Sequence, residues 1–337
     1  MGCAMVVALA RDGSKVTRDR INSRSHGLDP QIREFARKLN ESYSAHGVPE
    51  NLAHRRRIAE VVRSDWRTGG PEMAATHEMT VNGLRARLHR PTRRENGPVM
   101  LYIHGGGWVL FSIDTHDRLM REYAARAGIA VIGIDYSLSP EAKFPTALNE
   151  VYTSLQWLEA NAQTLDLDPA RILVGGDSAG ANLAVSACLM RREAGLPRLA
   201  GMLLNYGAFD PNPTASYALY SSPDHTLGPS EMDAFWAAYV DDPAQLADPL
   251  VAPLRAGLHD LPPAFLAIAE QDILADSNHA FAARLRQAGG EVEEVPYAGA
   301  THSFLEAVTI APLASRALND QAAWIRRRCR ALDHATA

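Results

Sequence analysis

Residues 172–180, with the sequence ILVGGDSAG, decide the predicted fold. The stretch opens with three apolar residues, passes through two glycines and runs into the helix-favouring segment ANLAV. This order predicts a strand, a sharp turn and a helix, with Ser178 at the apex. Gly176 and Gly180 flank the apex, where a side chain would clash because strand and helix pass close together. We expect the Ser178 hydroxyl to project beside the first N–H groups of the helix, which can face developing negative charge.

The pattern Gly-x-Ser-x-Gly alone also fits a glycine-rich turn that carries a solvated serine, so its surroundings must decide. Several other apolar runs are continuous, as expected for strands buried on both faces: 99–103, 130–134, 202–204 and 264–268. Helical segments are expected between most of them, at 115–127, 145–165, 179–194 and 276–288. Residues 76–81 and 84–90 alternate in polarity around Asn82-Gly83, which predicts a hairpin. A further strand at 292–297 and a closing helix at 312–332 complete an α/β chain with a mostly parallel sheet covered on both faces.

Two segments depart from this alternation. Helices are expected at 30–46 and 49–66, and their apolar residues are too sparse to form a core of their own. The long connection at 208–261 contains a predicted helix that starts at Ser230, with Asp233 in the capping-box position and Trp236 and Tyr239 after it. We therefore expect residues 1–75 and 208–261 to form a cap over a core made of 76–207 and 262–337. The alternative is that 208–261 is a surface excursion without function.

A serine needs a base to act as a nucleophile at neutral pH, and the base needs an orienting acid. After a nucleophile turn of this kind the partners follow in the order Ser, acid, His. His302 is the expected base, because it lies on a loop just after the last predicted strand. The rivals are His279, which falls inside a predicted helix, and His334, which is near the end of the chain.

The expected acid is Asp272, which follows the apolar strand at 264–268 and so reaches the same edge of the sheet. Asp276 lies one helical turn further on, where we expect it to cap the helix that it begins. Glu270 is still in or near the strand and is the weaker candidate.

An oxyanion that forms during attack on a carbonyl requires N–H donors. Gly105, Gly106 and Gly107 follow the strand that ends at residue 103, and successive glycines let the backbone approach a substrate closely. Their amides and the N–H of Ala179 are the expected donors. The alternative, a merely flexible loop, does not explain its place at the end of a central strand.

Composition excludes several other functions. The net charge of −5 gives no basic footprint for nucleic acid. The cysteines Cys3, Cys188 and Cys329 are far apart and match neither a disulfide framework nor a zinc site. Phosphate-binding glycine motifs and His-Glu-x-x-His are absent, so no cofactor or metal is expected. No basic segment precedes the apolar first ten residues, and no run is long enough to span a membrane, which predicts a cytoplasmic protein.

At this point the residues resemble the hormone-sensitive-lipase family of α/β-hydrolases, and within it the bacterial acetyl esterases. The resemblance covers residues 99–304 and rests on HGGGW at 104–108, DTHDR at 114–118, DYSLSPE at 135–141 with Phe144-Pro145, GDSAG at 176–180, and the segment 299–304. It implies an α/β-hydrolase fold with a helical cap, in which Ser178 is the nucleophile, His302 the base and Asp272 the acid. It also implies an oxyanion hole of Gly106, Gly107 and Ala179.

The resulting prediction is a serine carboxylesterase for small esters of short acyl acids, with activity that falls as the pH drops through about 6 to 7. The alternatives are amide or formamide hydrolysis by the same residues, or a regulatory role in binding proteins. A homodimer through exposed sheet-edge elements is a further expectation. Two departures from the family pattern matter: DILAD at 272–276 lacks the usual proline, and Phe111 stands where glycine is common, so its ring is expected to shorten or reshape the acyl pocket.

Overall fold

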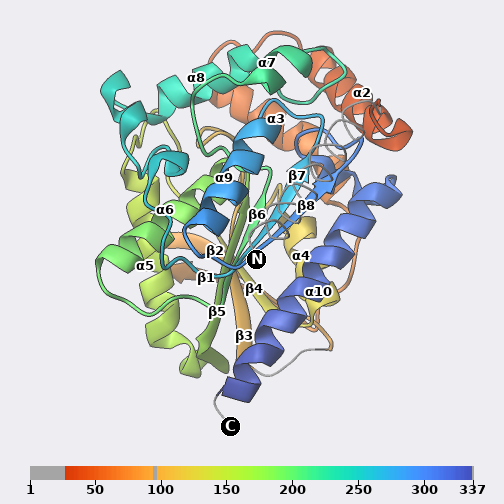
Figure 1. Cartoon of the computed structure of the whole chain (residues 1–337). Helices are drawn as coiled ribbons and strands as arrows, with labels where there is room; N and C mark the ends of the chain where they lie inside the picture. Colours follow the sequence, from red (N-terminus) through yellow and green to blue (C-terminus); the bar gives the residue numbers. More distant parts are fainter. Residues whose placement is uncertain (1–26, 94–96, 336–337) are drawn as a thin grey trace, which may run out of the picture.

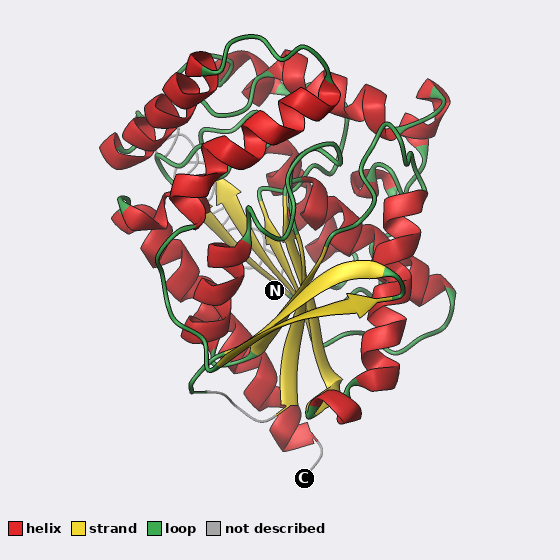
Figure 2. Ribbon diagram, turned by 180° about the vertical axis from the view of Figure 1, so that it is seen from behind, coloured by secondary structure: helices red, strands yellow, loops and turns green. Residues whose placement is uncertain are grey.

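The protein is described by a computed structural model over residues 27–93 and 97–335. The predictions made for the first ten residues and for Cys3 fall outside these ranges. One sheet of eight strands runs through the molecule in the order β1-β2-β4-β3-β5-β6-β7-β8. The strands are β1 (Ala75–Val81), β2 (Leu84–Arg90), β3 (Gly97–Ile103), β4 (Ala130–Ile134), β5 (Leu167–Asp177), β6 (Gly201–Asn205), β7 (Ala264–Ala269) and β8 (Val292–Tyr297). Strands β3 to β8 are parallel, while the β1–β2 hairpin is joined to β4 antiparallel (Figure 2).

Helices surround the sheet. They are α2 (Pro30–Ala45), α3 (Leu52–Arg67), α4 (Asp117–Ala127), α5 (Thr146–Asn161), α6 (Ala179–Glu193), α7 (Ala215–Leu219), α8 (Pro229–Tyr239), α9 (Ala275–Gln287) and α10 (Pro312–Ala335). Short 3-10 turns include η1 (Gln163–Leu165), η2 (Pro243–Ala247), η3 (Pro253–Arg255) and η4 (Phe304–Thr309). The predicted fold class, a mostly parallel sheet between helices, is confirmed. Across the described ranges, no helix combines the length and the apolar character that crossing a bilayer requires.

The central strands are buried on both faces, which explains their continuous apolar runs. Along β3, Val99, Leu101 and Ile103 point into one apolar cluster. Met100 and Tyr102 point into the other. Helices α5, α6 and α9 pack in the first cluster, and α4 and α10 in the second, so the alternation of side chains along one strand serves two layers (Figure 1).

Four helices lie together above the ends of the parallel strands: α2 and α3 from the beginning of the chain, and α7 and α8 from the long connection after β6 (Figure 1). An ion pair of 2.7 Å between Arg55 on α3 and Glu231 on α8 joins the two groups. We call these four helices the roof. The exact division of the chain into cap and core stays a prediction.

The predicted start of α8 is wrong. The helix begins at Pro229 with Gly228 as its N-cap, and among the described residues no side chain supplies a cap hydrogen bond. Proline at the first position has no N–H to satisfy, which lowers the need for a capping side chain. The expected capping box of Ser230 and Asp233 is therefore absent.

Two aromatic residues of α8 hold the helix against the core. Trp236 and Tyr239 are buried and pack on Trp108, with ring centroids 4.5 Å and 4.3 Å away. Their role is to seat α8 on the loop after β3, and neither lines the cavity described below.

Candidate active site

Ser178 sits at the turn between β5 and α6, with φ 53° and ψ −117°. A positive φ is unfavourable for a serine and is held here by the surrounding backbone. The Ser178 N–H donates to Asn205 O at 2.9 Å, and its carbonyl accepts from Ala208 N at 3.2 Å. A Cβ on Gly180 would lie 2.0 Å from Ile103 O, and one on Gly176 would lie 2.5 Å from the backbone of Gly180. The flanking glycines are thus required by close backbone contact.

The structure brings the three predicted catalytic side chains into one line. His302 Nε2 lies 3.0 Å from Ser178 Oγ, and His302 Nδ1 lies 2.6 Å from Asp272 Oδ2. Because an ionised carboxylate only accepts hydrogen bonds, Nδ1 carries the hydrogen, and Nε2 is left to accept one from the serine. All three side chains are buried.

Asp272 is held by its own turn, where its second oxygen, Oδ1, accepts from Leu274 N at 3.0 Å. The expectation that Asp276 caps α9 is wrong. The N-cap of α9 is Leu274, and Asp276 Oδ2 instead accepts from Ser216 N on α7 at 3.0 Å. Asp276 therefore ties the roof to the core.

The other rivals also have different partners. His279 on α9 lies between Glu270, which directly follows β7, at 2.6 Å and Glu294 on β8 at 2.5 Å. This cluster engages both the rival base and the rival acid Glu270. His334 lies in α10, beyond the residues whose side chains are described.

The glycine loop after β3 divides into two parts. The N–H of Gly105 donates to Asp177 Oδ1 at 3.1 Å, so the expectation that it faces a substrate is not met. Gly106 and Gly107 have φ of 111° and 61° and line the same cavity as Ser178. A Cβ on Gly107 would lie 2.2 Å from the Phe235 ring. Ala179 is the first residue of α6, so its N–H has no acceptor within the helix.

Asp177, beside Ser178, supports this loop in a way that the sequence analysis missed. It accepts from Tyr102 Oη at 2.8 Å as well as from Gly105, and it pairs with His116 Nε2 at 3.4 Å. Burial opposes both charges, but each partner outweighs it: the pKa of Asp177 is lowered and that of His116 is raised. His116 belongs to the motif DTHDR at 114–118, and that motif was the signal in the sequence that could have pointed to this role.

A second histidine of the loop, His104, is not a competing base. Burial and the nearby His116 lower the pKa of His104 to about 4, so the ring is neutral at physiological pH. Its Nδ1 lies 2.7 Å from Gly105 O, and the ring stacks on Tyr136. His104 thus shapes the glycine loop from below.

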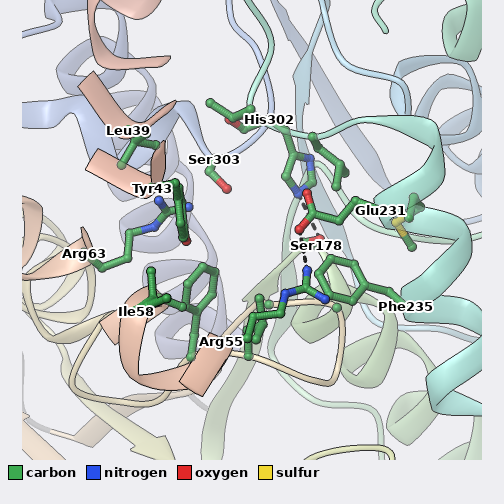
Figure 3. A pocket seen from close by; sticks show the side chains of 18 of the residues that line it. Leu39, Tyr43, Arg55, Ile58, Arg63, Ser178, Glu231, Phe235, His302 and Ser303 are labelled. Carbon is green, nitrogen blue, oxygen red and sulfur yellow. Dashed lines mark hydrogen bonds and ion pairs between the residues drawn. The ribbon is translucent and has the colours of Figure 1, made fainter. Parts of the chain in front are cut away.

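The three catalytic candidates open onto a cavity of about 310 Å³ beneath the roof (Figure 3). Its walls are largely apolar and include Ile58, Phe111, Leu227, Met232 and Phe235. The cavity also carries charged side chains from the roof: Figure 3 shows Arg55 and Glu231 next to Ser178, and Arg63 on the opposite side beside Tyr43. Sequence reasoning missed these charged residues, because single polar residues in a polar helix carry no distinguishing pattern.

The environment of His302 shifts its titration. Burial alone would lower the pKa of the imidazole, but the charge and the hydrogen bond of Asp272 outweigh burial. Asp177 and Glu306 act in the same direction. The pKa of His302 is therefore raised above its ordinary value of 6.5.

Comparisons with known proteins agree with this architecture. The sequence profile of a family described as "alpha/beta hydrolase fold" matches residues 100–306. Carboxylesterase NlhH of Mycobacterium tuberculosis is 36% identical over 246 residues, which cover 70% of this chain and 76% of that protein. A putative alpha/beta hydrolase, R526 of Acanthamoeba polyphaga mimivirus, is 31% identical over 82% of this chain and 81% of its own length.

Solved structures give the same result. A hyperthermophilic esterase from the archaeon Pyrobaculum calidifontis superposes with a TM-score of 0.83 and 31% identity, covering 90% of this chain and 99% of that one. EstE1, a thermostable carboxylesterase cloned from a metagenomic library, superposes with a TM-score of 0.79 and 33% identity, covering 83% of this chain and 98% of that one.

Proposed function

Since the chain belongs to the hormone-sensitive-lipase family of α/β-hydrolases and is a carboxylic ester hydrolase, we propose that it cleaves short-chain acyl esters through an acyl-enzyme on Ser178. The observation that carries the proposal is the line Ser178–His302–Asp272, with contacts of 3.0 Å and 2.6 Å. A serine joined to a histidine that is itself oriented by a carboxylate is the arrangement needed for nucleophilic attack.

In the first half of the reaction, Ser178 Oγ attacks the ester carbonyl while His302 Nε2 takes its proton. A tetrahedral intermediate forms, and its oxygen carries the negative charge. His302 then returns the proton to the alcohol oxygen, the C–O bond to the alcohol breaks, and the acyl group stays on Ser178. Asp272 keeps the ring in the tautomer that can accept and stabilises the imidazolium.

Donors for the intermediate come from Gly106, Gly107 and Ala179 in this proposal. The support is their position: two positive-φ glycines and the first amide of α6 surround Ser178. Each such donor is worth about 3 kcal/mol of barrier in enzymes of this kind.

The second half repeats these steps with water. His302 takes a proton from the water molecule that attacks the acyl carbonyl, and gives it back to Ser178 Oγ as the acyl bond breaks. The carboxylic acid leaves, and the free serine is regenerated.

Acyl chains are expected to be short, because Phe111 occupies the cavity wall beside the glycine loop. A Cβ on Gly106 would lie 2.8 Å from the Phe111 ring, so this ring borders the oxyanion site directly. We expect kcat/KM for p-nitrophenyl esters to peak between acetate and hexanoate and to fall for longer chains up to palmitate. The measurement is the rate of p-nitrophenol release at 405 nm. No ester turnover, with turnover of the matching p-nitroanilide, would instead favour the amide hydrolase.

The variant Phe111→Gly is the matched test of this wall. Phe111 has φ 73°, a conformation that glycine adopts without strain, so the backbone should tolerate the change. We expect octanoate turnover to rise several-fold relative to butyrate. An unchanged chain-length profile would contradict the assignment of Phe111 to the acyl site.

The dependence of activity on pH follows from His302, which must be neutral to act as a base. Because the pKa of His302 is raised, we expect kcat/KM to reach its maximum at alkaline pH and to fall as the pH drops through a midpoint above 6.5. This places the midpoint toward the upper end of the range expected from the sequence, or beyond it. Initial rates with p-nitrophenyl acetate between about pH 5 and 9, corrected for spontaneous hydrolysis, give the profile. A flat profile down to about pH 5 would contradict His302 as the base.

A further inference from the structure

One buried cation of the cavity has no part in the mechanism above. Arg63 on α3 lines the cavity with Ser178, although the residue is only 6% exposed. Its guanidinium lies over the Phe111 ring at 4.8 Å from the centroid and beside the Tyr43 ring at 6.0 Å. Figure 3 shows Arg63 and Tyr43 across the cavity from Ser178 and His302. The cation–π contacts with Phe111 and Tyr43 hold the guanidinium of Arg63 at the wall of the cavity.

The guanidinium of Arg63 has a charged partner, but two of its nitrogens make no hydrogen bond among the described residues. Arg63 Nε lies 2.7 Å from Glu306 Oε2, which forms a buried ion pair between α3 and η4. Arg63 Nε and Nη1 are both buried, and neither makes a hydrogen bond among the residues that the structure describes, because the contact of Nε with Glu306 is an ion pair without hydrogen-bond geometry. A buried donor without an acceptor is costly, and proteins seldom keep one without a use.

We propose that the Arg63 guanidinium donates a hydrogen bond to an uncharged oxygen in the acyl chain of the substrate, which makes the enzyme selective for acyl groups with a second oxygen. Ether, keto and hydroxyl oxygens are the acceptors of this class. The inference rests on the proposed esterase function. The acyl side follows from Phe111, because the ring that borders the oxyanion site is also the ring on which Arg63 lies.

The charges around the cavity favour a neutral acceptor over a carboxylate. Arg63 is already balanced by Glu306, and Arg55 by Glu231. Asp177 also lines the cavity, and its negative charge is paired with His116. A carboxylate on the substrate would add a further negative charge to a site without a spare positive one, whereas a neutral oxygen satisfies the free N–H at no such cost.

Two pairs of isosteric esters test the proposal. The acyl pair is p-nitrophenyl 3-methoxypropanoate and p-nitrophenyl pentanoate, in which an ether oxygen replaces one methylene. The alcohol pair is 2-methoxyethyl acetate and butyl acetate, with the same replacement on the other side of the ester. Selectivity is the ratio of kcat/KM for the oxygen-containing ester to that for its alkyl partner, each divided by the rate of hydroxide-catalysed hydrolysis to remove intrinsic reactivity.

Arg63→Met keeps much of the side-chain volume and removes the donor. Because it leaves Glu306 buried without a counter-charge, the double variant Arg63→Met/Glu306→Gln is measured beside it. In both, we expect the acyl ratio to fall about tenfold and the alcohol ratio to stay unchanged. Arg57→Met removes the same charge from an exposed position of the same helix, and it should leave both ratios unchanged.

The outcomes separate this inference from the function on which it rests. A wild-type acyl ratio at or below one overturns the inference even if neither variant folds. Equal losses for both acyl esters assign Arg63 a structural role only and also overturn it, as does an effect confined to the alcohol pair. Absence of alkyl ester turnover by the folded wild-type protein would instead overturn the proposed function.

Discussion

Replacing Ser178 with alanine should lower kcat for p-nitrophenyl acetate by about 10⁴-fold or more. The hydroxyl is the only group of the line Ser178–His302–Asp272 that can form the acyl bond, so the variant has no route to the covalent intermediate. The backbone at the turn is held by Asn205 and Ala208 rather than by the hydroxyl, and we expect the fold to survive. Initial rates, with circular dichroism as the check on folding, give the result.

A covalent probe makes the same prediction sharper. A fluorophosphonate reacts with a serine that is activated by a base, and intact mass should show one label on the wild-type protein. Ser303 also lines the cavity and serves as the control, because no hydrogen bond between its hydroxyl and His302 is present in the described structure. Labelling should disappear in Ser178→Ala and persist in Ser303→Ala. Persistence of both turnover and label in Ser178→Ala would contradict Ser178 as the nucleophile.

Exchange of Asp272 for asparagine is the second change expected to have a large effect, a fall in kcat of about 10⁴-fold. An asparagine can present its NH₂ to His302 Nδ1 and so favour the tautomer with hydrogen on Nε2. That ring cannot accept the Ser178 proton. The loss of the carboxylate also removes the charge that raises the pKa of His302. Both effects act on the chemical step, so kcat should fall much more than KM rises.

Asp276→Asn is the matched control, because the missing proline at 272–276 left the choice between two aspartates weaker at the level of sequence. In the structure Asp276 accepts from Ser216 N, and the amide oxygen of asparagine can accept the same bond. We expect kcat to change by less than about threefold, with a loss of unfolding free energy below about 1 kcal/mol. A greater loss of kcat in Asp276→Asn than in Asp272→Asn would reverse the assignment of the acid.

The parts that could be predicted from the sequence are those in which neighbouring residues carry the information. Strands buried on both faces need continuous apolar runs, and the carboxyl ends of parallel strands meet at one edge of the sheet. Asp272 and His302 could therefore be placed beside Ser178 from the strands that precede them. The glycines at 176 and 180 were readable for the same reason, because the backbone contact that they permit is local.

What could not be predicted depends on partners far away in the chain. Asp276 looked like a helix cap, but its hydrogen bond goes to Ser216, 60 positions earlier. Trp236 and Tyr239 could be placed on a helix of the long connection, but not against Trp108, on which they pack. Arg63 is one of several arginines in a polar helix, and nothing local separates it from Arg57, which is exposed. In each case the sequence shows the side chain, but it does not show which distant residue the side chain contacts in the folded protein.

The ion pair between Arg63 and Glu306 also bears on how the molecule is made. Its two members are near opposite ends of the chain, and both are buried in the finished protein. At ordinary speeds of translation, the helix with Arg63 leaves the ribosome on the order of ten or more seconds before Glu306 is synthesised. Until then Arg63 has no counter-charge in the interior, and burying its charge would be costly. We therefore expect α3 to remain in contact with water, not packed on the core, until Glu306 is present. The strand and turn around Ser178 can form earlier, but a nascent chain with a complete nucleophile turn should still be inactive, because His302 and Glu306 have yet to be synthesised.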